Sequence, residues 1–302
     1  MPTVYDIVTS KIVEMLEKGV IPWRRPWTST GLPRNLVSKK PYRGINYFLL
    51  SASKYVSPFW LTYRQAGQLG GHVRKGEEST VVVFWKVEDA RERSGDLDTA
   101  AEQPERQDNR RRWLLRYYRV FNLEQVELPE PVLVKLPKVE TFQHDPIERA
   151  ETIIEQMPNR PEIAHAGARA FYSPMFDRVT LTPRELFHTP EEYYASAFHE
   201  LSHSTGHAKR LARPEIMEIA PFGSATYSRE ELVAELSAAF LCAESGISNA
   251  TIENQASYLA GWLKALKSDS RLIVSAAAAA QRAADYILRR TSETQAEDQA
   301  AA

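Results

Sequence analysis

The segment His199-Glu200-Leu201-Ser202-His203 constrains the fold of this chain more than any other part of its 302 residues. On an α-helix, residues four apart lie on the same face, so the two imidazoles can bind one metal ion together. Glu200 then lies beside them, where it can accept a proton from metal-bound water. The pattern therefore predicts a helix with His199 and His203 as metal ligands and Glu200 as the catalytic base.

The residues upstream of this segment are typical of a helix start. Thr189 suits the N-cap, Pro190 suits the first helical position, and Glu192 completes a capping box. Apolar side chains then recur at helical spacing, at Tyr194, Ala197, Phe198 and Leu201. We therefore expect the two histidines on a well-capped helix.

A catalytic zinc site normally takes three protein ligands and leaves one position for water. The longer pattern HExxHxxGxxH would supply a third histidine, but Lys209 stands at that position, although Gly206 fits the glycine. A glutamate from a later helix is the other source. Residues 228–241 have the composition of such a helix, and on it Glu231 and Glu235 share a face one turn apart.

These two glutamates have competing interpretations. Ser228-x-x-Glu231 is itself a capping box, and Glu230 and Glu231 both suit the positive end of a helix dipole without any metal. Glu235 lies among apolar residues, where a carboxylate needs a partner. We favour Glu231 as the third ligand and Glu235 as the carboxylate that accepts the N–H of a ligating histidine, with the reverse order left open. One divalent ion is expected, zinc by its chemistry, with Mn²⁺ or another ion as alternatives.

Composition favours a soluble globular protein, with 43% hydrophobic and 25% charged residues. The single cysteine, Cys242, excludes an internal disulfide and a cysteine-liganded metal site, and it fits a reducing compartment. The first 18 residues have the pattern of an amphipathic helix and not of a signal peptide. No apolar run approaches the length that spans a membrane. We therefore expect a cytoplasmic protein with no membrane partner.

The charge is divided unevenly between the two ends of the chain. Residues 1–87 hold 13 Lys and Arg against 5 Asp and Glu, a net charge of +8, so the remainder carries −9. Aromatic residues alternate with these cations, which is how single-stranded nucleic acid is held: cations follow the phosphates while bases stack on rings. The predicted DNA contacts are Trp23, Arg24, Arg25, Trp27, Arg34, Lys39, Lys40, Tyr42, Arg43, Asn46, Tyr47, Trp60, Tyr63, Arg64, Arg74 and Lys75.

The first predicted domain covers residues 1–128 and has mixed α/β structure. Two β-branched and aromatic runs, 79–87 and 112–120, indicate a pair of strands. The polar, charged segment at about 88–111 between them is expected to be a flexible loop. A proline-rich segment, 129–145, is the predicted linker.

The second predicted domain covers residues 146–290 and is mostly helical. It is expected to begin with a helix near 147–157, followed by strands near 168–172 and 178–181 and then by the metal-binding helices. The tail, 291–302, is polar and expected to be disordered. The predicted fold class is therefore α+β, with a basic single-strand-binding domain and a metal-binding domain.

With these motifs in place, the chain resembles two known families. HExxH followed by Glu231-Leu-Val-Ala-Glu235 resembles the glutamate-liganded zincin metallopeptidases, in which the first acid binds the metal and the acid four residues later supports a histidine. The runs PYRGINY (41–47), WLTYRQA (60–66) and FHELSHSTGH (198–207) are similar to those of the ArdC antirestriction proteins. The first domain of that family is similar to the single-strand-binding region of TraC-type primases.

The resemblance implies a conjugative-plasmid protein that binds single-stranded DNA and shields incoming DNA from restriction enzymes. Two classes of function stay open. The protein protects DNA and its metal site is structural, or it is an active intracellular metallopeptidase that DNA brings to a protein target. A primase lacks support, because no second acidic cluster suited to nucleotidyl transfer is found in the sequence.

Overall fold

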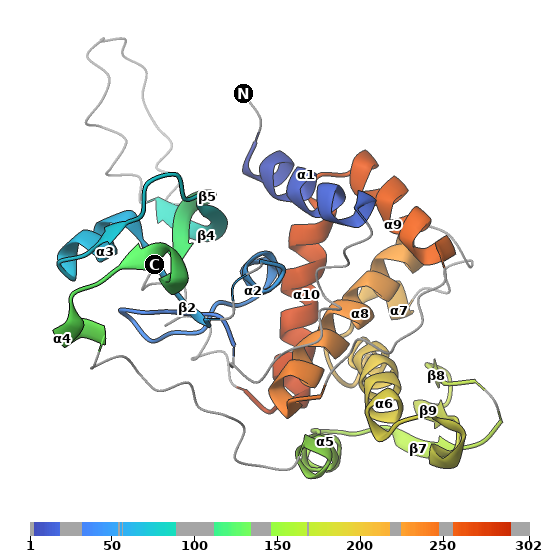
Figure 1. The fold of residues 1–302 in the computed structure, drawn as a ribbon. Coiled ribbons are helices and arrows are strands. Elements are labelled where there is room, and N and C mark those ends of the chain that lie inside the picture. Colours follow the sequence, from blue (N-terminus) through green and yellow to red (C-terminus); the bar gives the residue numbers. More distant parts are fainter. Residues whose placement is uncertain are drawn as a thin grey trace, which may run out of the picture.

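The structure is a computed structural model that describes residues 3–18, 32–53, 55, 57–88, 112–133, 146–167, 169–217, 225–247 and 256–290 (Figure 1). Several predicted features lie outside these residues: the DNA contacts Trp23, Arg24, Arg25 and Trp27, most of the loop at 88–111, most of the linker at 129–145, and the tail at 291–302. Both helices and strands occur in two parts of the chain, as the α+β class predicts. Within the described ranges, no helix combines the length and the apolar character needed to cross a membrane.

A four-stranded sheet in the order β1-β2-β5-β4 forms the base of the first part. Strands β4 (Thr80–Glu88) and β5 (Arg112–Asn122) pair antiparallel along their whole length, which confirms the predicted pair of strands. Strand β2 (Phe59–Thr62) pairs antiparallel with β5, and the short β1 (Arg34–Asn35) adds parallel to β2. Strand β4 is therefore an edge of the sheet.

Short elements surround this sheet: α2 (Ile45–Ser51), α3 (Tyr63–Gln68), β3 (His72–Val73), η3 (Leu123–Gln125), β6 (Val126–Glu127) and α4 (Glu130–Leu133). Helix α2 covers part of the β4 edge. The side-chain amide of Asn46 accepts from the N–H of Val83 and donates to its carbonyl, both at 2.7 Å. Asn46 thus takes the place of a neighbouring strand and closes an edge that would otherwise invite pairing with another chain.

The second part begins with α5 (Pro146–Glu155) and a three-stranded sheet in the order β7-β9-β8. Strands β8 (Phe171–Ser173) and β9 (Arg178–Leu181) form an antiparallel hairpin where the sequence predicts two strands. Strand β7 (Glu162–His165) pairs parallel with β9 and was not predicted, because four residues of mixed polarity carry no clear period. A short turn of helix, η4 (Arg184–Leu186), follows.

Helices make up the rest of this part: α6 (Pro190–Ser204), α7 (Pro214–Met217), α8 (Ala225–Ser245), α9 (Ala256–Ser268) and α10 (Leu272–Ile287). Helix α8 lies between α6 and α10 (Figure 1). Helix α10 carries buried alanines, among them Ala276, Ala280 and Ala283, whose small side chains allow neighbouring helices to approach closely. Helix α8 packs against both α10 and α6.

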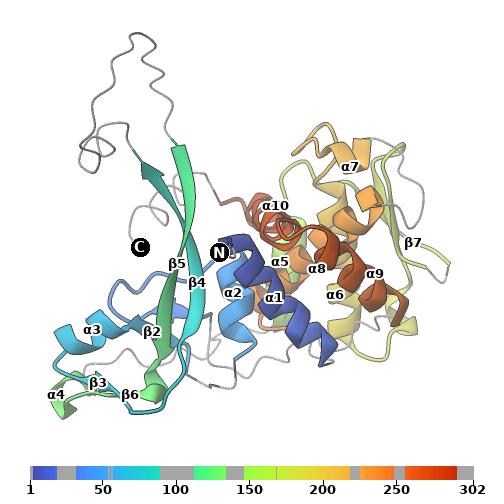
Figure 2. The same ribbon diagram turned by 90° about the horizontal axis from the view of Figure 1, so that it is seen from above.

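The N-terminal helix α1 (Val4–Glu17) packs against α9 and α10, at the other end of the chain (Figure 2). Thr9 Oγ1 donates to the carbonyl of Ser270 at 2.6 Å. One continuous core contains apolar residues from α1, α2, α6, α8 and α10, including Val8, Ile12, Phe48, Leu232 and Ile273. The core therefore runs across the predicted boundary between the two domains, whose limits stay a prediction.

Candidate metal centre

Helix α6 carries the HExxH segment, and its start is built largely as predicted. The hydroxyl of Thr189 accepts from the backbone N–H of Glu192 at 3.3 Å, and Pro190 occupies the first turn. The capping box, however, is only half formed. The Glu192 carboxylate accepts from the N–H of His188, at 3.0 Å, instead of from the N–H of Thr189. Buried Ala197, Phe198 and Leu201 fix the face that α6 turns to the core.

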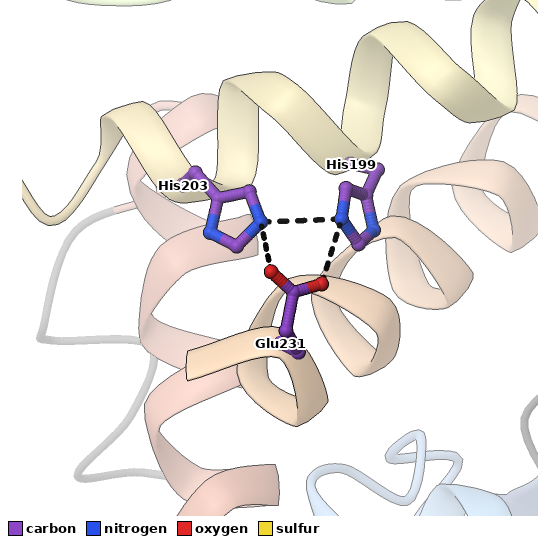
Figure 3. Close-up of side chains that lie close together, drawn as sticks. All are labelled: His199, His203 and Glu231. Atoms are coloured by element: carbon purple, nitrogen blue, oxygen red, sulfur yellow. Dashed lines mark hydrogen bonds and ion pairs between the residues drawn. The ribbon is translucent and has the colours of Figure 1, made fainter. Parts of the chain in front are cut away.

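Three side chains from two helices meet at one point (Figure 3). His199 and His203 lie one turn apart on α6, with their Nε2 atoms 3.1 Å apart. The carboxylate oxygens of Glu231, on α8, lie 3.5 Å from His199 Nε2 and 3.6 Å from His203 Nε2. Ligands held at about 2.0–2.1 Å from a tetrahedral ion lie roughly 3.3 Å apart, so these spacings fit a single metal ion. Two imidazoles and one carboxylate are also a donor set that zinc accepts.

Glu235 lies on the other side of His199. Its Oε1 is 3.9 Å from His199 Nδ1, whereas Glu231 approaches Nε2 of the same ring. That distance is an ionic contact, longer than a direct hydrogen bond. Glu235 is buried, in agreement with its apolar sequence neighbours. The geometry therefore favours Glu231 as the ligand and Glu235 as a supporting charge, the order that the sequence favoured but left open.

Glu230 and Arg213 hold His203 in place, and both are absent from the predicted site. His203 Nδ1 lies 3.2 Å from Glu230 Oε1. Arg213 donates to both oxygens of that carboxylate, with its Nε at 3.0 Å and its Nη2 at 2.5 Å. When Nδ1–H donates to Glu230, the lone pair of Nε2 is left for a metal. Burial raises the pKa of Glu230, but the bonds to His203 and Arg213 outweigh it and lower the pKa, so the carboxylate stays charged.

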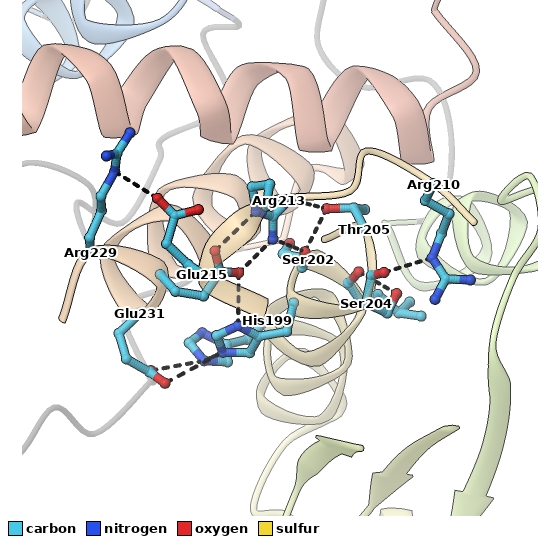
Figure 4. A network of polar contacts seen from close by, with 12 residues as sticks. His199, Ser202, Ser204, Thr205, Arg210, Arg213, Glu215, Arg229 and Glu231 are labelled. Atoms are coloured by element: carbon cyan, nitrogen blue, oxygen red, sulfur yellow. Dashed lines mark hydrogen bonds and ion pairs between the residues drawn. The ribbon is translucent and has the colours of Figure 1, made fainter. Parts of the chain in front are cut away.

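Figure 4 shows the wider network around this arginine. Arg213 also donates to the hydroxyl of Thr205, at 2.6 Å, and to the carbonyl of Ser202, at 2.9 Å, near the C-terminal end of α6. Arg213 lies in an irregular segment before α7, where no periodic signal exists. From the sequence, Glu230 has only the interpretation of a residue suited to the helix dipole. The one signal in the sequence that could have included Glu230 in the predicted site was its position directly before Glu231.

Negative charge dominates the surroundings of His199. Burial lowers the pKa of His199, but its hydrogen bond with Glu231 and the charges of Glu200 and Glu235 outweigh it and raise the pKa to about 9. The site thus favours positive charge at this point, a need that a divalent cation would meet. Glu200 is 8% exposed and follows His199 on α6, which places a nearly dry carboxylate beside the ligands.

The predicted DNA contacts divide into exposed and buried side chains. Tyr63 is 68% exposed, and the described cations are exposed or partly so: Arg34, Lys39, Lys40, Arg43, Arg64, Arg74 and Lys75. Trp60, Tyr47 and Asn46, in contrast, are at most 5% exposed. Trp60 and Tyr47 pack in the core, and the amide of Asn46 is hydrogen-bonded to the backbone of Val83, so the prediction is corrected for these three. Tyr42 is also buried, but, like Asn46, it lines a cavity.

Strand β5 carries exposed residues that the sequence analysis did not select. Arg116, Tyr117, Tyr118 and Arg119 all lie on the surface. Because side chains alternate along a strand, Arg116 and Tyr118 lie on one face of the sheet and Tyr117 and Arg119 on the other. The segment is recognisable as a strand, and its two Arg–Tyr pairs are a signal that could have placed it among the DNA contacts.

Comparison with known proteins places this geometry in a family. Residues 2–121 match the N-terminal domain of anti-restriction factor ArdC, and residues 148–279 match a zincin-like metallopeptidase domain. The uncharacterized protein y4eC of Sinorhizobium fredii (strain NBRC 101917 / NGR234) is 37% identical over 304 residues, which cover 97% of this chain and 94% of that protein. A DNA primase TraC of Escherichia coli is 37% identical over 295 residues, but the chain spans only 20% of that primase's length.

Two solved structures match nearly the whole chain. The metal-free crystal structure of the antirestriction protein ArdC from plasmid R388 superposes with a TM-score of 0.73 at 33% identity, covering 95% of this chain and 97% of that one. Its Mn(II)-bound structure gives a TM-score of 0.72 at the same identity, covering 96% and 98%. With both parts matched in order and at nearly full length, the chain belongs to the ArdC family of antirestriction proteins, with a zincin-like metallopeptidase domain as its second part.

Proposed function

We propose that this protein binds single-stranded DNA with its basic half and protects incoming plasmid DNA from the restriction enzymes of the recipient cell. The similarity to R388 ArdC over 95% of the chain carries the proposal. The net charge of +8 on residues 1–87 and the TraC primases among the relatives support the part that concerns DNA. Protection would take place in the cytoplasm, where incoming DNA meets the restriction enzymes.

The proposed DNA surface consists of cations and aromatic rings that reach solvent. Arg64, Arg74 and Lys75 lie on and after α3, and Tyr63 presents a largely free ring beside them. Cations of this kind neutralise phosphates, and an exposed ring can stack on an unpaired base. The affinity should therefore fall with rising salt, with a slope of about 0.7 per phosphate contacted on a single strand. An affinity that does not change with the salt concentration would contradict the proposed phosphate contacts.

A divalent metal ion at His199, His203 and Glu231 is part of the proposal. The fit of three ligand atoms to one ion supports it, as does the Mn(II)-bound form of R388 ArdC. We propose zinc as the resident ion, with manganese as the alternative. Bound there, the ion would polarise a water molecule or a carbonyl group. Glu200 would accept a proton beside the ligands, Glu230 would orient His203 through Nδ1, and Glu235 would add a negative charge near His199.

The antirestriction proposal is tested by the efficiency with which unmodified plasmid DNA enters two recipients, one with and one without a restriction system. The wild-type protein should raise the efficiency in the restricting recipient alone. An equal effect in both recipients, or no effect in either, would contradict the proposal.

A second function, peptidase activity on a protein brought close by DNA, is favoured by the buried Glu200 beside a full set of ligands. Glu200→Gln separates the two functions, with Glu191→Gln, on the same helix, as the matched control. If Glu200→Gln protects DNA as well as the control does, catalysis is not the mechanism and the metal is structural. If it loses protection while still binding DNA, the peptidase function is favoured.

A further inference from the structure

A cavity of about 230 Å³ lies between the edge of the sheet in the first part and helix α10 in the second. Helix α2 contacts both β4 and α10, and Figure 2 shows it between the sheet and the helical part. Tyr42 and Phe84 line the cavity from the side of the sheet, and Ala278, Gln281 and Arg282 line it from α10. Cavities for drug-sized ligands hold about 300–1,000 Å³, so this one suits a smaller group.

The cavity borders another hollow, on the face of the sheet that carries Tyr118. A second hollow of about 100 Å³ shares Tyr42 and Phe84 with the first, and Lys40, Gln65 and Tyr118 complete it. The ring centres of Tyr42 and Phe84 are 6.2 Å apart, and those of Phe84 and Tyr118 are 5.8 Å apart. The two hollows therefore lie next to each other along a row of three aromatic rings, and we call them together the seam groove. Tyr118, at one end of this row, is 39% exposed.

Arg282 supplies a positive charge at the α10 end of the seam groove. Among the described residues, no carboxylate pairs with it, whereas Arg43, in the same cavity, pairs with Asp285. Desolvation and the charges of Arg213 and Arg229 lower the pKa of Arg282, and no acidic group opposes this effect. Arg282 is exposed, so an anion can reach it from solvent, and the other two arginines already have their own glutamates.

We propose that the seam groove is the path of single-stranded DNA, with one unstacked base in the cavity against Tyr42 and Phe84 and its phosphate on Arg282. The proposal rests on the proposed binding of single-stranded DNA and deepens it. Aromatic rings in a row suit successive bases, and a cavity of this size admits a base only after it has left a duplex. The DNA would then touch α10, the helix that packs along α8, where Glu231 lies. The single-stranded DNA would then contact both parts of the chain.

The test compares variants that alter the seam groove in two different ways. Arg282→Gln removes the unpaired charge, and Arg289→Gln, which removes an exposed charge just after the same helix, is its control. Ala278→Phe fills the cavity, and Ala278→Ser keeps it open. Affinity for a fluorescent oligothymidine is measured by anisotropy across a salt series, and thermal denaturation checks that each variant folds.

Each variant has its own expected result. Arg282→Gln should weaken binding about five- to tenfold and reduce the salt slope by roughly 0.7, the share of one phosphate, while Arg289→Gln changes the affinity less than twofold. Ala278→Phe should weaken binding at least about fivefold with an unchanged salt slope, because it removes a stacked base and no charge. Free thymidine monophosphate in millimolar excess should not displace the fluorescent oligothymidine, because a single nucleotide lacks the contacts that the neighbouring nucleotides make along the groove.

A second measurement locates the bound single-stranded DNA directly and does not depend on any variant. An oligonucleotide that carries 5-iododeoxyuridine, irradiated on the wild-type protein, should crosslink to Tyr118, Phe84 or Tyr42, as mapped by mass spectrometry. Crosslinks found only elsewhere, or equal affinities of Arg282→Gln and Arg289→Gln, would overturn the seam groove while leaving DNA binding intact. A wild-type protein that binds no single strand at all would instead overturn the proposed function.

Discussion

The metal centre and the basic sheet of the first part handle charge in opposite ways. At the metal centre, two histidines and four glutamates lie on two packed helices, and each charged side chain there is at least four-fifths buried. On the sheet and α3, the cations are spread over the surface, where water reaches them. Interactions strengthen when water is excluded and weaken when it screens them. One substitution should therefore matter greatly in the first region and little in the second.

The largest effect is expected from Arg213→Ala. Removal of one partner of a buried ion pair leaves the Glu230 charge without compensation, which typically costs about 3–5 kcal/mol of unfolding free energy. Denaturant unfolding measures the change. Arg229→Ala is the control, because that arginine is 43% exposed and its pair with Glu215 is worth at most about 1 kcal/mol. Equal losses in the two variants would remove the contrast between buried and exposed charge.

His203→Ala should cost about 10²- to 10³-fold in metal affinity. Structural zinc sites bind with about 10–16 kcal/mol over four ligands, so one ligand is worth roughly 2.5–4 kcal/mol. Titration calorimetry with Zn²⁺ and Mn²⁺ on metal-stripped protein gives the two affinities. His188→Ala removes an exposed histidine just before the same helix and should bind as the wild type does. If His203→Ala also binds as the wild type does, the ion lies elsewhere.

Glu230→Gln should weaken metal binding by about 10- to 100-fold, the usual effect of losing a carboxylate that orients a ligating histidine. The same titration measures it, and circular dichroism confirms that the helices remain. Glu215→Gln, on α7, is the matched control. An unchanged affinity in Glu230→Gln would mean that the contact of Glu230 with His203 serves folding alone.

On the basic side, Tyr63→Ala should lower the affinity for single-stranded DNA about fivefold, near the low end for one stacked base, and leave stability unchanged. Trp60→Phe should do the reverse, because Trp60 is 1% exposed and packs in the core. Anisotropy and thermal denaturation on both variants decide this. A loss of DNA affinity in a stably folded Trp60→Phe would return Trp60 to the interface.

The smallest effect concerns pH at the turn of the β8–β9 hairpin. Burial raises the pKa of Asp177, but its bonds with Arg210 and Tyr172 outweigh this and lower the pKa overall. A carboxylate with a lowered pKa stabilises the fold above its unfolded value, near 4, and loses that stabilisation as the pH falls through the folded value. The stability difference between the wild type and Asp177→Asn should therefore shrink below about pH 4 in thermal denaturation. A constant difference would contradict this assignment.

The sequence predicted the elements whose signals are local. Helix α6 follows from Thr189, Pro190 and the apolar spacing, and the β4–β5 hairpin follows from two β-branched runs. Prediction succeeded less well for the aromatic residues of the first part. Trp60 and Tyr63 lie three residues apart with the same kind of neighbours, yet one is in the core and the other is largely exposed. Trp60 belongs to strand β2 and its side chain enters the core, whereas Tyr63 is the first residue of helix α3 and faces solvent. Composition does not determine that difference.

The sequence by itself determined that two histidines share one helical face with Glu200 beside them, because the period of the helix alone produces that arrangement. The tertiary structure decided what surrounds them. It brought Glu231 to Nε2 of both rings, placed Glu235 at Nδ1 of His199, and joined Glu230 to Arg213. These contacts link helix faces and an irregular segment far apart in the chain. Their distances depend on how α8 packs against α6, and no local spacing encodes that packing.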